Sequence, residues 1–326
     1  MRLRDLGEWE LLRRLAAYAP PGQFNDDAAL LAERSGQQLV VNTDVLVEGV
    51  HFSDTTIGPR DLGWRAAAAN LSDLAAMGCT EVAGITVALV APGDTAWTWV
   101  EGVYAGLRDA LAPHGAVILG GDCSSGRERL LSITALGRLA EGSVIRRGDG
   151  RPGDWLVSSG PHGLSRLGLA LLLDELEASQ VSPALQERAI RSHRRPRPRL
   201  EAVSALHSSR PNGLAWRVGG TDSSDGLAAA VVAIATTSGC GALLERSQLP
   251  IDPELAQLEP GEGWCLGGGE DFELVLALTP SWAEALMAAL PGSSRIGCLV
   301  EATPGLLCWQ DSGEPLAAES GFTHFR

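Results

Sequence analysis

The sequence contains no lysine, and all 26 of its Lys and Arg residues are arginine. Its 40 acidic residues leave a net charge of −14. A P-loop requires its Lys, and a protein-kinase site requires the Lys of its third strand, so both classes are excluded. A nucleic-acid surface needs clustered positive charge, which argues against a nucleic-acid partner. If this protein handles phosphates, it must neutralise them with arginine, backbone N–H groups and metal ions.

Other absences bound the class of protein. No apolar run reaches the ~20 residues of a membrane-spanning helix, and the start of the chain lacks the apolar core of a signal peptide, so no membrane contact is expected. No C-x-x-C pair occurs, which predicts free thiols in a reducing cytoplasm rather than a disulfide frame or a zinc site. The 326 residues, 45% of them apolar, predict two globular domains or one large one. The six cysteines are scattered, at Cys79, Cys123, Cys240, Cys265, Cys298 and Cys308.

The stretch from Leu39 to Phe52, L-V-V-N-T-D-V-L-V-E-G-V-H-F, begins with an apolar, β-branched run that predicts a buried strand. We expect that strand to end at Asn42, Thr43 and Asp44, whose side-chain oxygens suit a hard cation such as Mg²⁺. A polar turn after a strand is the alternative. His51, further along, is either a structural histidine or a donor to an anionic substrate.

Residues 61–77 predict a buried helix with Asp61 as its N-cap. Asn70 and Asp73 are three residues apart and share one face of it. A buried Asp without Arg or Lys within a turn is costly unless a cation pairs with it, so Asp73 is a candidate metal ligand. Periodicity predicts further helices at 7–19, 97–111, 164–177 and 228–238, and strands at 84–90, 116–119, 130–136 and 155–159.

Short acidic segments recur beside glycine or serine. Gly121 and Asp122 follow the strand at 116–119, and Asp222 and Asp225 flank the start of a helix. Such segments can hold a metal ion and a phosphate, but a surface turn or a helix cap accounts for each one alone. Two further pairs are Asp26-Asp27 near the N-terminus and Glu270-Asp271 after a glycine run.

The segment 138–154 is rich in Gly, Arg and Pro and is the candidate domain boundary. Arg146 and Arg147 within it could bind a phosphate, although a solvated linker is an equal alternative. We therefore expect an N-terminal domain over 1–140 and a C-terminal domain over 141–326.

Six motifs occur in one order along nearly the whole chain: N-D-D-A-A, N-T-D-x-L-V-E-G-V-H-F, N-L-S-D-L-A-A-M-G, G-G-D, D-S-S-D-G-L and G-G-E-D-F-E-L. Together they resemble the thiamine-monophosphate kinase family, within the superfamily of aminoimidazole ribonucleotide synthetase and selenophosphate synthetase. The second and third motifs are specific to the kinase branch. The alternatives are another ATP-dependent synthetase of the superfamily and a non-catalytic metal- or nucleotide-binding relative.

The resemblance implies a reaction in which ATP phosphorylates thiamine monophosphate by direct in-line transfer assisted by a Mg²⁺ cluster. It implies these metal ligands: Asp27, Asn42, Thr43, Asp44, Asp73, Asp122, Asp222 and Asp225. Of these it implies a catalytic role for Asp44, Asp73, Asp122 and Asp225. It implies nucleotide contacts at Gly121, Asp122, Arg147 and Ser224, and substrate contacts at His51, Glu270 and Phe322.

The fold that the resemblance implies is α/β (α+β) with two domains. An N-terminal mixed sheet pairs across a homodimer into a barrel, and its half supplies metal and nucleotide ligands, while a C-terminal α/β domain completes the site. Three departures put the nucleotide geometry, but not the metal site, in question. Asn25 stands where Gly is usual, Cys123-Ser124 replace a Thr pair, and Ser223 replaces an aliphatic residue.

Overall fold

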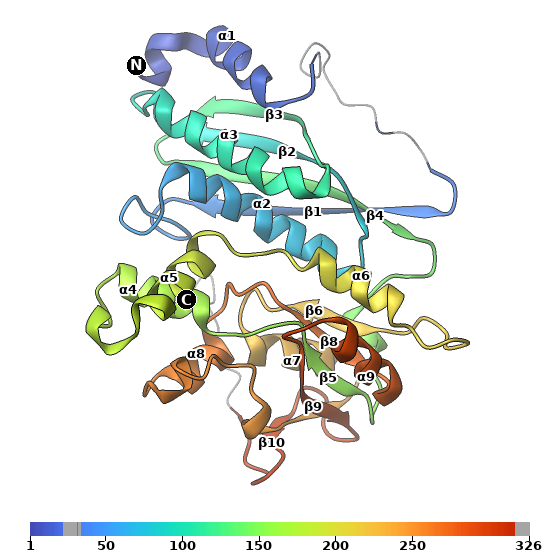
Figure 1. The fold of residues 1–326 in the computed structure, drawn as a ribbon. Coiled ribbons are helices and arrows are strands. Elements are labelled where there is room, and N and C mark those ends of the chain that lie inside the picture. The colour runs from blue at the N-terminus through green and yellow to red at the C-terminus, as the bar shows by residue number, and fades with distance from the viewer. Residues whose placement is uncertain (22–30, 32–33, 317–326) are drawn as a thin grey trace. The chain divides into compact units, whose positions relative to one another are not determined.

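The computed structural model spans residues 1–326 and describes residues 1–21, 31 and 34–316 (Figure 1). The chain divides into two compact units, Met1–Leu74 with Glu81–Leu139, and Ala75–Thr80 with Ala140–Arg326. Two of the predicted site residues, Asp27 and Phe322, lie outside the described residues.

The first unit is built on a mixed sheet. Strand β2 (Glu81–Ala91) pairs with β3 (Ile118–Ser125) in parallel and with β4 (Leu130–Ala140) in antiparallel fashion, which confirms the mixed sheet predicted for this half. Helices α2 (Pro59–Ala76) and α3 (Trp97–Leu111) lie over the same face of the sheet (Figure 1). The four strands stand in the order β1 (Gln37–Val47), β4 (Leu130–Ala140), β2 (Glu81–Ala91) and β3 (Ile118–Ser125).

Side chains of β1 alternate between two different environments. Val40, Asn42, Asp44 and Leu46 are partly or fully buried, because this set faces the helices. The opposite face of the strand is apolar and exposed, with exposed fractions of 52% at Leu39, 63% at Val41 and 43% at Val45. In the run predicted as a buried strand, Leu39–Val41, only Val40 is partly buried, so the prediction of burial was wrong for Leu39 and Val41.

Two predicted strand ends were wrong. Strand β1 continues through Asn42, Thr43 and Asp44 to Val47, and β3 continues through Gly120-Gly121-Asp122 to Ser125. Polar residues and glycines resemble turn signals in a sequence, but neighbouring strands supply the backbone partners that keep them extended. The candidate ligands consequently lie within the strands.

Helix bounds agree closely with the sequence in the middle of the chain and less well near its ends. Helix α3 has the predicted bounds, while α1 (Leu3–Leu15) begins before the predicted residue 7 and has positive φ at Gly7. Helix α2 begins at Pro59, so Asp61 lies in its first turn and is not its N-cap. An acidic residue there still favours the helix, because the N-terminal end of the helix dipole is positive.

Two glycines bring α2 and α3 into backbone contact within the first unit. A Cβ atom at Gly63 would lie 1.9 Å from the carbonyl oxygen of Val103, and one at Gly106 would lie 1.9 Å from that of Arg60. Only hydrogen fits at these two positions. The contact fixes the distance between α3 and α2, the helix that carries Asn70 and Asp73.

The second unit is built on a six-stranded sheet covered by short helices. Its central strand β5 pairs with both β8 and β9 in antiparallel fashion, and β10 joins β7 in parallel at one edge. The strands follow one another as β10 (Leu307–Trp309), β7 (Gly241–Leu244), β9 (Ser294–Val300), β5 (Trp155–Ser158), β8 (Leu274–Leu278) and β6 (Gly219–Asp222). The helices are α4 (Leu164–Leu172), α5 (Pro183–Arg194), α6 (Leu200–Ser208), α7 (Leu227–Thr237), α8 (Gly261–Gly267) and α9 (Pro280–Ala289).

The core of the second unit forms between α7 and its sheet. Leu227, Val231 and Ile234 of α7 are fully buried against Val275 and Leu299 of the strands. Because β6 leads into α7, this packing fixes the connection that carries the D-S-S-D-G-L motif. Helix α4 ends at Leu172, five residues before the predicted end.

All six cysteines are free, which confirms the prediction from their spacing. Over the described ranges, no helix combines the length and the apolar character needed to cross a bilayer.

The contact between α2 and α3 makes a stability prediction. Gly106→Ala should destabilise the protein by about 2 kcal/mol, since the new methyl group must displace the backbone at Arg60. The free energy of unfolding in urea measures this loss. Gly263→Ala in α8 is the control. A Cβ at this position meets nothing within 4 Å, and the substitution replaces a glycine within a helix by alanine, which favours the helix. Equal stabilities for the two variants would contradict the close contact.

Candidate active site

Asn42 joins strand β1 to helix α2 through its side-chain amide. Its Nδ2 donates to Asn70 Oδ1 at 3.1 Å and to Asp73 Oδ2 at 2.8 Å. The backbone N–H of Asp44 donates to Asn70 Oδ1 at 3.2 Å, and Asn70 Nδ2 is held by the carbonyl oxygen of Ala66. Asn70 and Asp73 thus share the face of α2 that their spacing predicted.

The oxygen atoms of this group fit a hard cation. Asn42 Oδ1 is buried and has no hydrogen-bond partner in the part of the chain that the structure describes. Burial raises the pKa of Asp44, so its ionised form needs a positive partner. Asp73 is partly buried, not fully buried as predicted, and its carboxylate accepts from Asn42. An amide oxygen and two carboxylates on one side of β1 are ligands that Mg²⁺ prefers.

Thr43 points to the other side of β1. Its hydroxyl lies 2.8 Å from that of Thr134 on β4, on the exposed face of the sheet. Successive side chains of a strand alternate, so the hydroxyl of Thr43 is on the opposite side from Asn42 and Asp44. The structure therefore does not bring this hydroxyl together with its predicted partners.

His51 lies in the turn that follows β1, and its orientation is fixed. The backbone N–H of Val47 donates to His51 Nδ1 at 3.1 Å. Since Nδ1 accepts a hydrogen bond, the proton of the neutral ring is on Nε2, which makes that atom a donor.

Arg129, the residue before β4, makes side-chain contacts that hold the same turn in place. Its guanidinium pairs with Glu48, lowering the pKa of that carboxyl, and donates to Asp54 Oδ1 at 3.0 Å. It also lies 4.9 Å from the ring of Trp99, on which Phe52 stacks. The position of His51 is thus set by ion pairs and aromatic packing around it.

Gly121 and Asp122 lie on β3, opposite Val87 and Ala88 of β2. Both are exposed, which leaves the backbone of Gly121 and the carboxylate of Asp122 accessible to a ligand.

In the second unit the D-S-S-D-G-L motif connects β6 to α7. Asp222 ends the strand and is buried, with 5% of its surface exposed, whereas Ser224 and Asp225 are exposed. Arg147 is close to this strand, since its Nε donates to Thr221 Oγ1 at 3.1 Å. Four of the residues predicted to bind metal or nucleotide are thus gathered around the end of β6.

Glu270 is joined to the same motif by its backbone. Its N–H donates to the carbonyl oxygen of Ser224 at 2.7 Å. Its carboxylate is partly exposed and lies 4.0 Å from His193 Nδ1. The predicted substrate contact and nucleotide contact are therefore neighbours within this unit.

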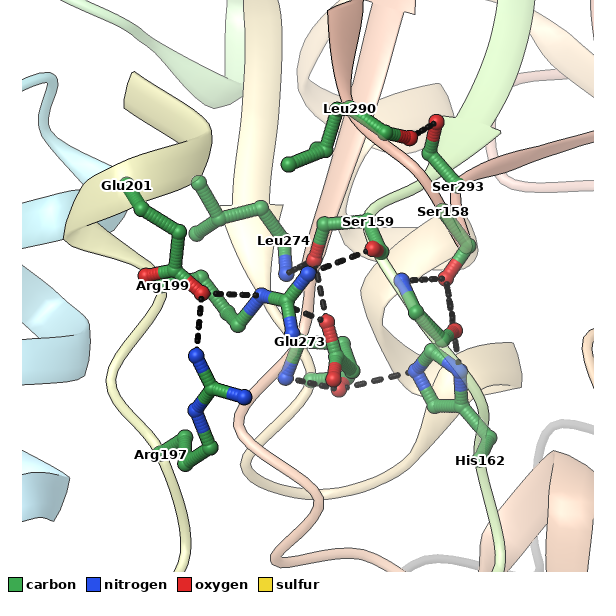
Figure 2. A network of polar contacts seen from close by, with 12 residues as sticks. Ser158, Ser159, His162, Arg197, Arg199, Glu201, Glu273, Leu274, Leu290 and Ser293 are labelled. Carbon is green, nitrogen blue, oxygen red and sulfur yellow. Dashed lines mark hydrogen bonds and ion pairs between the residues drawn. The ribbon is translucent and has the colours of Figure 1, made fainter. Parts of the chain in front are cut away.

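A buried polar network beside these motifs was not predicted from the sequence (Figure 2). Glu273 accepts from Ser159 Oγ and pairs with Arg199, whose Nε lies 3.2 Å from Glu273 Oε2. His162 Nε2 lies 2.9 Å from Ser223 Oγ, and its Nδ1 lies 3.4 Å from Ser158 Oγ. The signal available beforehand was Ser223 itself, a polar residue where an aliphatic one is usual.

Within the described ranges, no group of three or more His, Cys, Asp or Glu side chains is close enough to hold a metal ion. The amide oxygen of Asn42 is not of these residue types, and Asp27 is outside those ranges. The fit to a cation therefore rests on Asn42, Asp44 and Asp73.

Two family models match the chain. Residues 25–139 match the N-terminal domain of AIR synthase related proteins, and residues 151–303 match the C-terminal domain of the same proteins. The class is therefore that of the two-domain AIR synthase related proteins, which agrees with the two-sheet architecture.

Comparison with individual proteins narrows the class. The chain is 45% identical to the thiamine-monophosphate kinase of Prochlorococcus marinus, covering 99% of this chain and 97% of that protein. It is 47% identical to the thiamine-monophosphate kinase of Synechococcus elongatus, covering 99% and 98% respectively. The chain belongs to the thiamine-monophosphate kinase family, which confirms the resemblance carried by its motifs.

A solved structure of the same kind has the same fold. AaThiL complexed with AMPPCP and TMP matches with a TM-score of 0.76 and 29% identity, over 100% of this chain and 99% of that one.

The buried His162 makes a pH prediction. Burial lowers its pKa from 6.5 to about 4, so between these values the unfolded chain binds a proton that the folded protein does not. The free energy of unfolding should therefore fall as the pH drops from 7 to 4.5. The fall should be about 2 kcal/mol larger in the wild-type protein than in His162→Gln. Urea unfolding of both proteins at the two pH values measures the difference. Parallel pH dependences would contradict a neutral, buried imidazole.

Proposed function

We propose that this protein transfers the γ-phosphoryl group of ATP to thiamine monophosphate, giving thiamine diphosphate and ADP. The observation that carries the proposal is the 45–47% identity to thiamine-monophosphate kinases over nearly the whole chain. The capture of AaThiL with AMPPCP and TMP supports it independently.

The acceptor supplies its own nucleophile. A phosphate monoester has a second pKa of about 6, so its oxygen is anionic at neutral pH and needs no general base. The barrier arises instead from repulsion between this anion and the polyphosphate of ATP. The chain has to hold both groups in line and to screen their charges.

The residues that would hold Mg²⁺ are Asn42, Asp44 and Asp73 in the first unit, supported by the buried Asn42 Oδ1, for which the described residues supply no hydrogen-bond donor. Bound Mg²⁺ supplies charge screening and alignment of phosphate oxygens. Family motifs add further proposed ligands at Asp27, Thr43, Asp122, Asp222 and Asp225. Because Thr43 turns its hydroxyl toward Thr134, any contribution from it would come from its backbone.

The remaining roles follow from chemistry and exposure. The exposed backbone of Gly121 and the exposed Ser224 suit contacts to the nucleotide, and Arg147 provides a guanidinium for its phosphates. His51 offers its Nε2 proton to the phosphate of thiamine monophosphate. Glu270 offers a carboxylate to the cationic part of the same substrate. Phe322, in the family motif G-F-T-H-F, is the proposed aromatic contact to the thiamine.

We further propose a homodimer formed through the first unit. The supporting feature is the row of exposed apolar residues on β1, Leu39, Val41 and Val45, on the face opposite the helices. A second copy of this chain would remove that surface from water. The six free thiols support a reducing, cytoplasmic setting.

Purified protein with Mg-ATP and thiamine monophosphate should produce thiamine diphosphate, measured by chromatography. Asp44→Asn and Asp73→Asn should each lower turnover by about 100-fold or more, because each removes a carboxylate that would hold the Mg²⁺ screening the reacting phosphates. Both should also weaken the rise in melting temperature that Mg²⁺ causes, a readout independent of activity. Asp94→Asn, a change to an exposed residue paired with Arg2, is the control.

Absence of product from the wild-type protein with ample Mg²⁺ would overturn the proposed activity and favour a sister synthetase or an idle binding protein. Near-normal turnover in either variant would remove that residue from the metal site.

The dimer makes a separate prediction. Val41→Glu should shift the protein from dimer to monomer in light scattering, since the charge would be buried in the interface. Thr55→Glu, an exposed change elsewhere in the first unit, should leave the mass unchanged. A monomeric wild-type protein would contradict this assembly.

A further inference from the structure

Two carboxylates next to Glu270 have no part in the chemistry proposed above. Asp271 and Glu273 belong to the same G-G-G-E-D-F-E segment, and both point away from solvent into contacts within the second unit. Each one anchors the segment to a different part of the unit.

Asp271 caps helix α4 from a distance. Its Oδ2 accepts from the backbone N–H of Gly163 at 2.7 Å, and its Oδ1 accepts from that of Ser165 at 3.0 Å. The helix has glycine at its N-cap, so no local side chain can satisfy these donors. Asp271 therefore ties the segment to a rigid helix end.

Glu273 ties the other end of the segment to a buried ion pair (Figure 2). Its carboxylate accepts from Ser159 Oγ and lies 3.2 Å from Arg199 Nε, while Arg199 Nη2 donates to the carbonyl oxygen of Ser159 at 2.7 Å. A Cβ at Gly160 would lie 2.5 Å from Glu273 Oε1, so the backbone closes over the carboxylate. Both side chains are largely withdrawn from solvent, with exposed fractions of 11% for Arg199 and 9% for Glu273, and Arg199 Nε also lies 3.4 Å from Glu201 Oε1.

The backbone on both sides of Asp271 is strained. Glu270 has φ of 59° and Phe272 has φ of 53°, and Gly269 before them has φ of 67°. A non-glycine residue with such a φ is unfavourable and persists only when surrounding contacts hold it. Asp271, between these two residues, and Glu273, directly after them, make the side-chain contacts described above.

The segment is also joined to the D-S-S-D-G-L motif. Glu270 N–H donates to Ser224 O at 2.7 Å, and Ser223 N–H donates to Glu273 O at 2.9 Å. Glu273 N–H in turn donates to Ser223 Oγ at 3.2 Å. A shift of one segment would therefore move the other.

We propose that Asp271 and Glu273 are positioning residues that hold the strained backbone presenting Glu270. This inference rests on the proposed function, in which Glu270 contacts the thiamine monophosphate. Loss of either anchor releases the backbone toward ordinary φ values and turns the Glu270 carboxylate away from the substrate. The fold survives, because the core of the unit lies between α7 and the sheet.

Kinetics of isosteric variants test the proposal. Asp271→Asn and Glu273→Gln should each raise the KM for thiamine monophosphate by about tenfold, since a small misplacement weakens a directed contact. Assays at pH 8.5 keep both wild-type carboxyls ionised, because burial raises the pKa of each to about 7. An unchanged KM in both variants overturns the proposal.

Asp154→Asn is the matched control for a lost buried anchor. Asp154 accepts from the backbone N–H of Arg151 at 2.8 Å and pairs with Arg217 at 2.6 Å, contacts of the same kind in the same unit. It should lower stability without changing the KM. An equal rise in KM for this variant would show that general destabilisation is responsible and would overturn the proposal.

A double-mutant cycle separates positioning from a merely structural role. If Asp271 acts through Glu270, Asp271→Asn should have no further effect on KM in a Glu270→Gln background. Effects that multiply in the double variant overturn the proposal.

Hydrogen exchange of the substrate-free protein gives a readout that does not depend on activity. Asp271→Asn should speed exchange in the peptide over 267–273, where the Glu270 N–H is bonded to Ser224, and Asp154→Asn should not. If the wild-type protein fails to phosphorylate thiamine monophosphate, the proposed function falls while this measurement still decides the anchoring. Unchanged exchange in 267–273 overturns the anchoring itself.

Discussion

The desolvation of carboxylates is the constraint on which the rest of the structure depends. A lysine-free chain with a net charge of −14 must place acidic side chains near one another without ammonium partners. It does so in two ways. At Asn42, an amide donates to Asp73, and its own oxygen has no hydrogen-bond partner among the described residues. At Glu273, a guanidinium and a hydroxyl compensate part of the charge of a buried carboxylate. The first arrangement leaves a buried amide oxygen of the described part of the chain available as a ligand, whereas the second surrounds a carboxylate with donors from the protein itself.

Helix periodicity and side-chain spacing predicted much of the fold and part of the site. The bounds of α3 and the shared face of Asn70 and Asp73 follow from local sequence, because both depend on residues within a few turns. The ends of β1 and β3 could not be predicted in the same way. Asn42 and Gly121 are turn-like residues that stay extended only because distant strands and helices pair with them.

The roles of Asp271 and Glu273 were beyond prediction for a related reason. Their partners, Gly163 and Ser159, are more than 100 residues away in the chain. Glu270, Asp271 and Glu273 look alike in a sequence, yet one is partly exposed and the others are anchors. Ser223 gave a clue without an explanation, and its bonds to His162 and Glu273 now account for a hydroxyl at that position.

The glycine at the start of α4 has a consequence for the order in which the protein is made. The N–H groups of Gly163 and Ser165 at this helix end donate to Asp271, a residue that leaves the ribosome more than 100 positions later. During synthesis α4 therefore emerges as a short helix without its cap, and isolated helices of this length are marginal in water. The cap of α4 can therefore form only after the segment bearing Glu270 has been made, and a chain truncated before residue 271 lacks it.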